Sequence, residues 1–182
     1  IRLAHRREAL AEEEGLAGRL AAIAEGLPAA RERAAGWRVR GSGFGPLADG
    51  LEGTARAARR ALGRALTQGG AEARHAWRRE AKYHALHVEL LVGLWPGALR
   101  RHARLVQRLV NLLGAEHNLV LLLTPLGEEP PDAGLEALGA AARAEQDALL
   151  SRIVPLGRRL HAERPAALRR RFGAYWDIWR SE

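Results

Sequence analysis

The sequence of 182 residues contains no cysteine and no methionine. Without cysteine the chain cannot form a disulfide, a thiolate nucleophile or a zinc site with sulfur ligands, and such a chain suits a reducing compartment. We therefore expect the protein in the cytoplasm. Aromatic residues are also scarce, with five tryptophans, two tyrosines and two phenylalanines. Alanine, leucine and arginine dominate instead, and because these residues favour helices over strands, the composition predicts an all-α protein.

Long apolar runs are absent as well. No segment approaches the roughly 18 uninterrupted apolar residues of a membrane-spanning helix, and no charged and then apolar signal segment begins the chain, so we expect no membrane insertion. Hydrophobic residues make up 47% of the chain and charged residues 27%, a balance typical of a domain with its own core. The first residue lies inside a helical pattern and methionine is missing, so we expect the natural chain to be longer.

Apolar residues recur at helical spacing, and glycine and proline divide the pattern into segments. Gly26 and Pro28 are predicted to end the first helix, and Pro155 to separate two later ones. A glycine-rich loop at 36–46 separates an N-terminal helical segment, 1–35, from an antiparallel helical bundle, 46–182. The predicted helices cover residues 2–25, a short piece ending at 35, 46–67, 71–94, 98–123, 135–154, 155–163 and 165–179.

Positive charge is concentrated in one part of the chain. Residues 54–113 hold twelve Arg or Lys residues against three acids, whereas the remaining residues have a net charge of minus one. At about 100° per residue, the basic residues of each of three predicted helices fall on one side, opposite an apolar side. These three basic stripes are Arg56, Arg59, Arg60 and Arg64, then His75, Arg78, Arg79 and Lys82, then Arg100, Arg101, Arg104 and Arg108.

Any surface helix is polar away from the core, so one stripe alone indicates little. Three stripes of one sign are harder to explain in this way, because like charges three or four residues apart repel by about 0.2 to 0.5 kcal/mol. We therefore predict a shared basic groove for a linear polyanion or for single phosphate and sulfate ions, with affinity that falls steeply as salt rises. RNA is a rival ligand, although the basic faces contain almost no aromatic residues on which bases could stack.

The histidines allow several interpretations. His75 lies on a basic stripe, where contact with phosphate would raise its pKa. His84 and His102 share sides with apolar residues and are predicted to be hydrogen-bonded histidines of the core. His117 follows Gly114, at a possible irregularity of the helix, and faces the groove or caps that irregularity. A metal site is the weaker alternative, because a second Glu-x-x-His helix is missing from a set made of Glu80, His84, His87 and His117.

No arrangement of residues nominates a catalytic nucleophile. Gly41, Gly43 and Gly45 form a GxGxG pattern without the strand and helix that a phosphate loop requires. The aromatic cluster Tyr175, Trp176 and Trp179 has helical spacing and is predicted to pack the last helix. We expect a binding module rather than an enzyme, with no cofactor. The enzymatic alternative is a phosphotransfer or phosphatase bundle that uses an exposed histidine.

Residues 75–91, HAWRREAKYHALHVELL, resemble the HEWRKxxKYxxYxLxLL pattern of the CHAD family, the conserved histidine α-helical domain. The residues that follow match two further family motifs, LWP at 94–96 and LLGxxHDLxVL from Leu112 onward. Residues 50–60 are similar to GLxxTYRRGRR, and the last part of the chain to RLYAExP and YWxxW. The resemblance covers most of residues 46–180 and concerns the second half of the family's pattern. No first basic half is found before Gly36, so residues 1–35 are interpreted as the end of a missing or divergent first half.

The resemblance implies a fold of two related four-helix halves and a basic groove or pore that binds inorganic polyphosphate without catalysis. The groove residues that it carries over to this chain are Arg56, Arg59, Arg60, His75, Arg78, Arg79, Lys82 and His117. The stripes add Arg64, Arg100, Arg101, Arg104 and Arg108.

Overall fold

The computed structural model describes residues 15–38, 41–127 and 132–182. These residues form helices and no strand, which confirms the all-α prediction. The chain divides into two compact units, residues 1–40 and 41–182.

The described part of the first unit is one helix, α2, which spans Leu16–Ala35. The predicted helix end at Gly26 and Pro28 is wrong, because α2 continues through both residues. Proline removes one backbone hydrogen bond, but the alanine-rich segment around it has a high helix propensity. No residue of α2 is buried, and an apolar row at Leu16, Leu20, Ile23 and Leu27 is exposed. The first part of the predicted helix, residues 2–14, lies outside the described residues.

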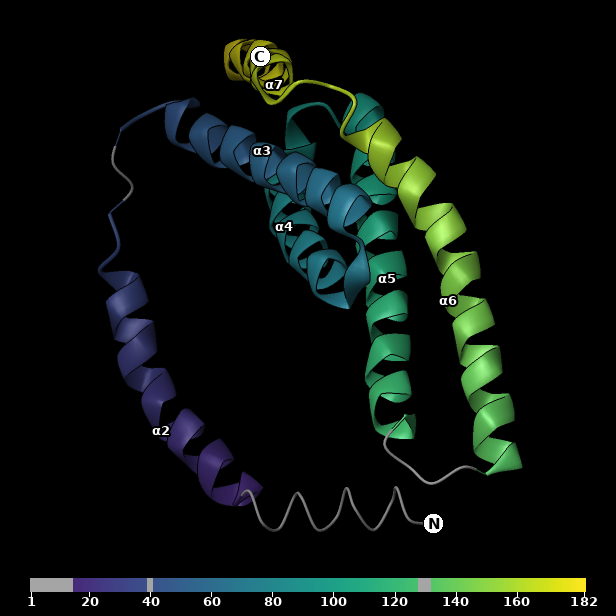
Figure 1. The fold of residues 1–182 in the computed structure, drawn as a ribbon. Coiled ribbons are helices and arrows are strands. Elements are labelled where there is room, and N and C mark those ends of the chain that lie inside the picture. Colours follow the sequence, from purple (N-terminus) through teal and green to yellow (C-terminus); the bar gives the residue numbers. More distant parts are fainter. Residues whose placement is uncertain (1–14, 39–40, 128–131) are drawn as a thin grey trace. The chain divides into compact units, whose positions relative to one another are not determined.

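The second unit is a bundle of antiparallel helices crossed by a last one. In this unit α3 packs against α4, α4 against α5 and α5 against α6, and α7 packs against α3 and η1. Figure 1 shows α5 and α6 side by side over most of their length. The elements are α3 (Gly45–Gln68), α4 (Gly70–Leu90), the short 3-10 helix η1 (Val92–Leu94), α5 (Pro96–Leu126), α6 (Ala133–Leu160) and α7 (Pro165–Ser181).

Two of these helices are longer than the sequence predicts. Pro155 does not separate two helices, because α6 continues through it to Leu160. Pro155 itself is exposed, while Ile153 and Gly157 on either side of it are buried. Packing of this buried side therefore offsets the lost backbone hydrogen bond. Likewise α5 shows no interruption at Gly114.

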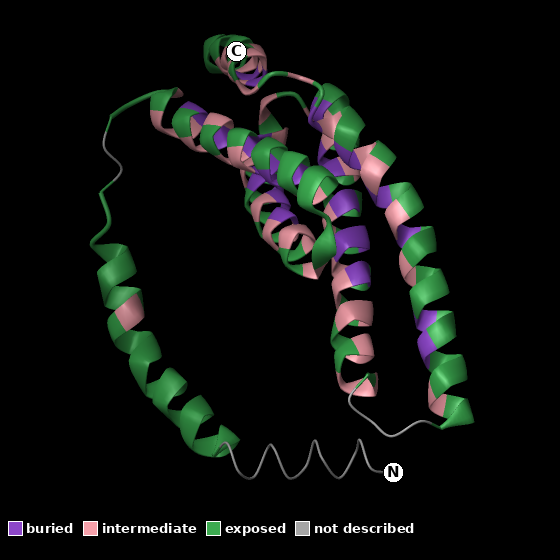
Figure 2. Cartoon of the chain, in the orientation of Figure 1, coloured by how far each residue is buried: buried purple, intermediate pink, exposed green. Residues whose placement is uncertain are grey.

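The main core lies among α3, α4, α5 and α6, and Figure 2 shows buried residues on their facing sides. The ring of Trp77 on α4 crosses this core, and it is 1% exposed. It reaches α6 at Gly157, where a Cβ atom would lie 2.6 Å from Cη2 of Trp77. A second core, which includes Leu51, Val88, Leu99 and Phe172, joins α3, α4, α5 and α7. Tyr175 packs against it, and the Tyr175 ring meets Trp95 edge to face at 5.0 Å.

Gly157→Ala tests this packing. The added methyl group would overlap the Trp77 ring, and neither backbone nor ring can move freely in a packed core. We expect the free energy of unfolding to fall by about 1 to 3 kcal/mol, as in other overpacked cores. Urea unfolding would measure it, with Gly63→Ala on α3 as control, since a Cβ there meets no atom within 4 Å. Equal stabilities of the two variants would contradict the close contact.

By length and composition, α5 is the described helix that could cross a membrane. In the bundle, however, Leu109 and Leu113 of this helix are buried in the core. Its Glu116 is 2% exposed and accepts hydrogen bonds from Arg74 of α4 at 2.7 Å and from Gln146 of α6 at 2.8 Å. In this structure α5 thus forms a central helix that ties its two neighbours together.

Candidate anion-binding clefts

An open cleft of about 490 Å³ lies between α3 and the start of α7, and we call it the α3 cleft. Arg56, Arg59 and Arg60 reach it from α3, where spacings of three and four residues place them on one face. The opposite face of α3 is buried, which sets the rotation of the helix. Arg164 joins them from the turn before α7. The full lining is Glu52, Arg56, Arg59, Arg60, Arg164, Pro165 and Ala166.

The charge of the α3 cleft is poorly compensated. Its acid, Glu52, pairs with Arg56 and also with Arg169, at 3.2 Å. Arg59, Arg60 and Arg164 form no ion pair with any residue that the structure describes. Three guanidinium groups therefore remain available to an incoming anion, and each can bind phosphate oxygens bidentately.

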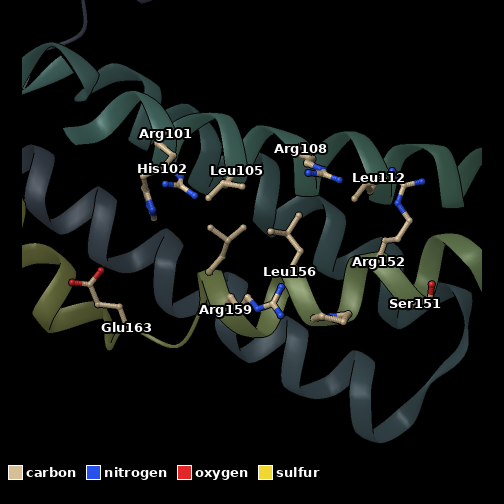
Figure 3. A pocket seen from close by; sticks show the side chains of 12 residues that line it. Arg101, His102, Leu105, Arg108, Leu112, Ser151, Arg152, Leu156, Arg159 and Glu163 are labelled. Carbon is tan, nitrogen blue, oxygen red and sulfur yellow. The ribbon is translucent and has the colours of Figure 1, made fainter. Parts of the chain in front are cut away.

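A second cleft, of about 640 Å³, lies between α5 and α6, and we call it the α5–α6 cleft (Figure 3). Arg101 and Arg108 enter it from α5, and Arg152 and Arg159 enter it from α6. Apolar side chains separate these arginines. The full lining is Arg101, His102, Leu105, Arg108, Leu112, Ser151, Arg152, Pro155, Leu156, Arg159, Leu160 and Glu163.

The basic stripe of α4 lines neither of these two clefts and lies near α5. The rings of His75 and His117 are 4.5 Å apart between their centroids, which brings together two histidines predicted from separate motifs. Arg78 is half-buried beside Gly114, and its Nε is 3.7 Å from the position that a Cβ of Gly114 would take. Arg79 and Lys82 are exposed, and Arg79 pairs with Glu80 at 3.3 Å.

The predicted groove residues are thus distributed over several surfaces. Arg59 and Arg108 line two different clefts rather than one shared groove. Arg64, Arg100 and Arg104 are exposed and line neither of these clefts. The sequence prediction missed Arg152, Arg159 and Arg164, because they lie outside the basic block at 54–113. The one signal for two of them is the seven-residue spacing of Arg152 and Arg159, which places both on one side of a helix.

Three histidines meet where α4, α5 and α6 approach the turn before α7. His84 is buried, as predicted, and its Nδ1 lies 3.5 Å from the Thr54 hydroxyl; its ring is 6.3 Å from that of His161. Burial, together with smaller contributions from the neighbouring His161 and His102, lowers the pKa of His84 to about 3. Burial, together with a smaller contribution from Arg59, likewise lowers the pKa of His161 to about 4.

His102 differs from its prediction as a hydrogen-bonded core residue. It is half-buried on the edge of the α5–α6 cleft, and its Nε2 has no hydrogen-bond partner among the described residues. Burial lowers its pKa, and Arg171 does so too, while Glu163 acts in the opposite direction. Since these three pKa values are lowered, the cluster is uncharged at neutral pH.

No group of three or more histidine or acidic residues in the described part of the chain could hold a metal ion. Two histidines of the metal site that the sequence offered as the weaker alternative, His84 and His87, have different surroundings. His84 is buried, whereas the Nδ1 of His87 lies 3.0 Å from the carbonyl oxygen of Tyr83 on its own helix.

Comparison with known proteins identifies one family. A model of the CHAD domain matches residues 2–127, which is more than half of the chain and includes α3, α4 and α5. The match also includes the N-terminal segment, where the motifs had shown no resemblance, and it ends before α6. No curated protein and no solved structure matches the chain. With the motifs, the helical bundle and this match in agreement, the chain belongs to the CHAD domain family.

Proposed function

We propose that this protein binds inorganic polyphosphate without catalysis, and that the α3 cleft is the centre of the binding surface. CHAD domains in general bind polyphosphate, which supports this ligand. The observation that carries the proposal is the set of three guanidinium groups, of Arg59, Arg60 and Arg164, that share one open cleft and have no acidic partner in the described part of the protein. The exposed arginines and Lys82 along α3, α4 and α5 extend the positive surface beyond it.

Polyphosphate suits this surface physically. The chain carries a negative charge at every unit, so it gains from basic residues that recur along a face at about 5 to 6 Å. Binding releases condensed counterions, so the affinity should fall as salt rises. For each phosphate that is neutralised, a tenfold rise in salt concentration should lower the binding constant by nearly tenfold. RNA would gain from the same charges, but the α3 cleft has no aromatic lining residue on which a base could stack.

The test is calorimetric titration of the protein with long-chain polyphosphate at several salt concentrations. Replacing Arg59, Arg60 and Arg164 with glutamine should weaken binding at least about tenfold and reduce the salt slope by about two to three. The control changes Arg143, Arg158 and Arg180 to glutamine, which removes equal charge from exposed positions outside both clefts.

Equal losses in the two triple variants would show that overall charge, not the cleft, holds the ligand. Single-stranded RNA, added as a competitor at fixed salt, distinguishes the two candidate ligands. Displacement of polyphosphate by RNA at an equal concentration of charge would favour nucleic acid as the ligand. Release of inorganic phosphate during the titration would contradict a non-catalytic role.

A further inference from the structure

The α5–α6 cleft differs from the α3 cleft in having an apolar middle. Figure 3 shows Leu105 of α5 and Leu156 of α6 between the two helices. Arg108 and Arg152 lie to one side of these leucines, and Arg101 lies to the other. Leu112, Pro155 and Leu160 add to the apolar lining. The cleft therefore combines positively charged ends with an apolar centre.

The spacing of the arginines follows from the helices. Arg101 and Arg108 are seven residues apart on α5, and Arg152 and Arg159 are seven apart on α6. Seven residues are about two helical turns, or about 10 Å along the axis, so each helix presents both arginines on one side. Because the helices are antiparallel, Arg108 of α5 and Arg152 of α6 come to the same end of the cleft, whereas Figure 3 shows Arg159 close to Leu156.

These arginines have no acidic partner. None of the four forms an ion pair with another residue of the described ranges. The acid at the edge of the cleft, Glu163, already accepts two hydrogen bonds from Arg171, at 2.8 and 3.1 Å. The cleft consequently has an excess of positive charge that its own residues do not balance.

A bare phosphate chain is a poor match for this cleft. It is charged along its whole length, so anionic oxygens would lie against leucine side chains and lose water without gaining a hydrogen bond. A molecule with an anionic head and an apolar body places each part against its complement. A volume of about 640 Å³ is also typical of sites for small organic ligands.

We infer that the α5–α6 cleft binds an organic phosphate, with its phosphoryl group held by the arginines of one end and its apolar body over Leu105 and Leu156. This site is separate from the α3 cleft and goes beyond the polyphosphate function. Half of its lining comes from α6, which lies outside the residues that match the CHAD family.

Two matched pairs of probes test the ligand class. Decyl phosphate, below its micellar concentration, is compared with inorganic phosphate, and ATP is compared with inorganic tripolyphosphate. In each pair the phosphate group is similar and the organic body is added. We expect at least one organic probe to bind ten or more times more tightly than its inorganic partner. Preference for decyl phosphate points to an acyl or lipid phosphate, and preference for ATP to a nucleotide.

Three variants locate the site. Arg152→Gln with Arg159→Gln should weaken binding of the organic probe at least tenfold, and Leu105→Asn should remove most of its advantage over the inorganic partner. Leu105 is half-buried and lies outside both core clusters, so this change leaves the core intact. The control is Arg143→Gln with Arg158→Gln, at exposed positions of α6, the helix that carries Arg152 and Arg159. It should have no comparable effect on binding of the organic probe.

The glutamine variant of Arg59, Arg60 and Arg164 keeps this test independent of polyphosphate binding. This variant should retain its affinity for the organic probe even when its binding of polyphosphate is lost. The inference is overturned if neither organic probe binds more tightly than its inorganic partner, or if Leu105→Asn weakens both members of a pair equally. Thermal unfolding of each variant confirms that it is folded before titration.

Discussion

Lowering the pH from 7 to 5 is expected to reduce the free energy of unfolding by about 4 kcal/mol through His84 and His161 alone, about 2 kcal/mol from each. The two rings are only 4% and 7% exposed. Burial is the main reason that the folded protein binds protons at these rings only near pH 3 and pH 4. The unfolded chain binds them near pH 6.5. The unfolded state therefore takes up more protons between these values, and stability falls as the pH falls through 6.5.

Urea unfolding at pH 7, 6 and 5 would measure this dependence. His84→Gln should reduce the pH slope by about one proton, because one titrating group is removed. His75→Gln, at an exposed position outside this cluster, is the control for replacing a histidine. The surroundings include Arg59, which opposes protonation of His161, and the Arg171–Glu163 pair beside His102. A stability that stays constant from pH 7 to pH 5 would contradict the burial of this cluster.

Loss of Arg74 should have an effect of similar size. Its guanidinium neutralises the buried carboxylate of Glu116, at 2.7 Å, and Arg74→Met would leave that charge with Gln146 as its remaining hydrogen-bond partner. Breaking a buried ion pair from one side costs about 3 to 5 kcal/mol, because an uncompensated charge stays in the core. Urea unfolding at pH 7 would show the loss.

The double variant Arg74→Met with Glu116→Leu provides the matched control. Removing both charges also removes the desolvation penalty, so this variant should recover most of the lost stability. Arg79→Met with its neighbour Glu80→Leu, on the exposed side of α4, should change stability by less than about 1 kcal/mol. If Arg74→Met proves as mild as this exposed double variant, the buried ion pair of Arg74 and Glu116 is contradicted.

The fold class and most helix boundaries could be predicted from local patterns. The breaks at 69–70 and 95–96 were visible because glycine and proline act through the backbone of their own turn. The prolines at 28 and 155 misled the prediction for the same reason, since each lies inside a continuous helix. Their cost is local and limited, whereas the buried side of α6 gains its stability from residues far away in the sequence.

For the candidate sites, the residue pattern of this chain established which side of each helix carries arginine, because a helix repeats every 3.6 residues and spacing alone specifies a face. It could not establish what lies opposite that face. Arg59 meets a turn more than a hundred residues later, and Arg108 meets arginines and leucines of α6. Those neighbours follow from how the apolar sides of four helices pack around Trp77, a long-range arrangement that no local spacing contains.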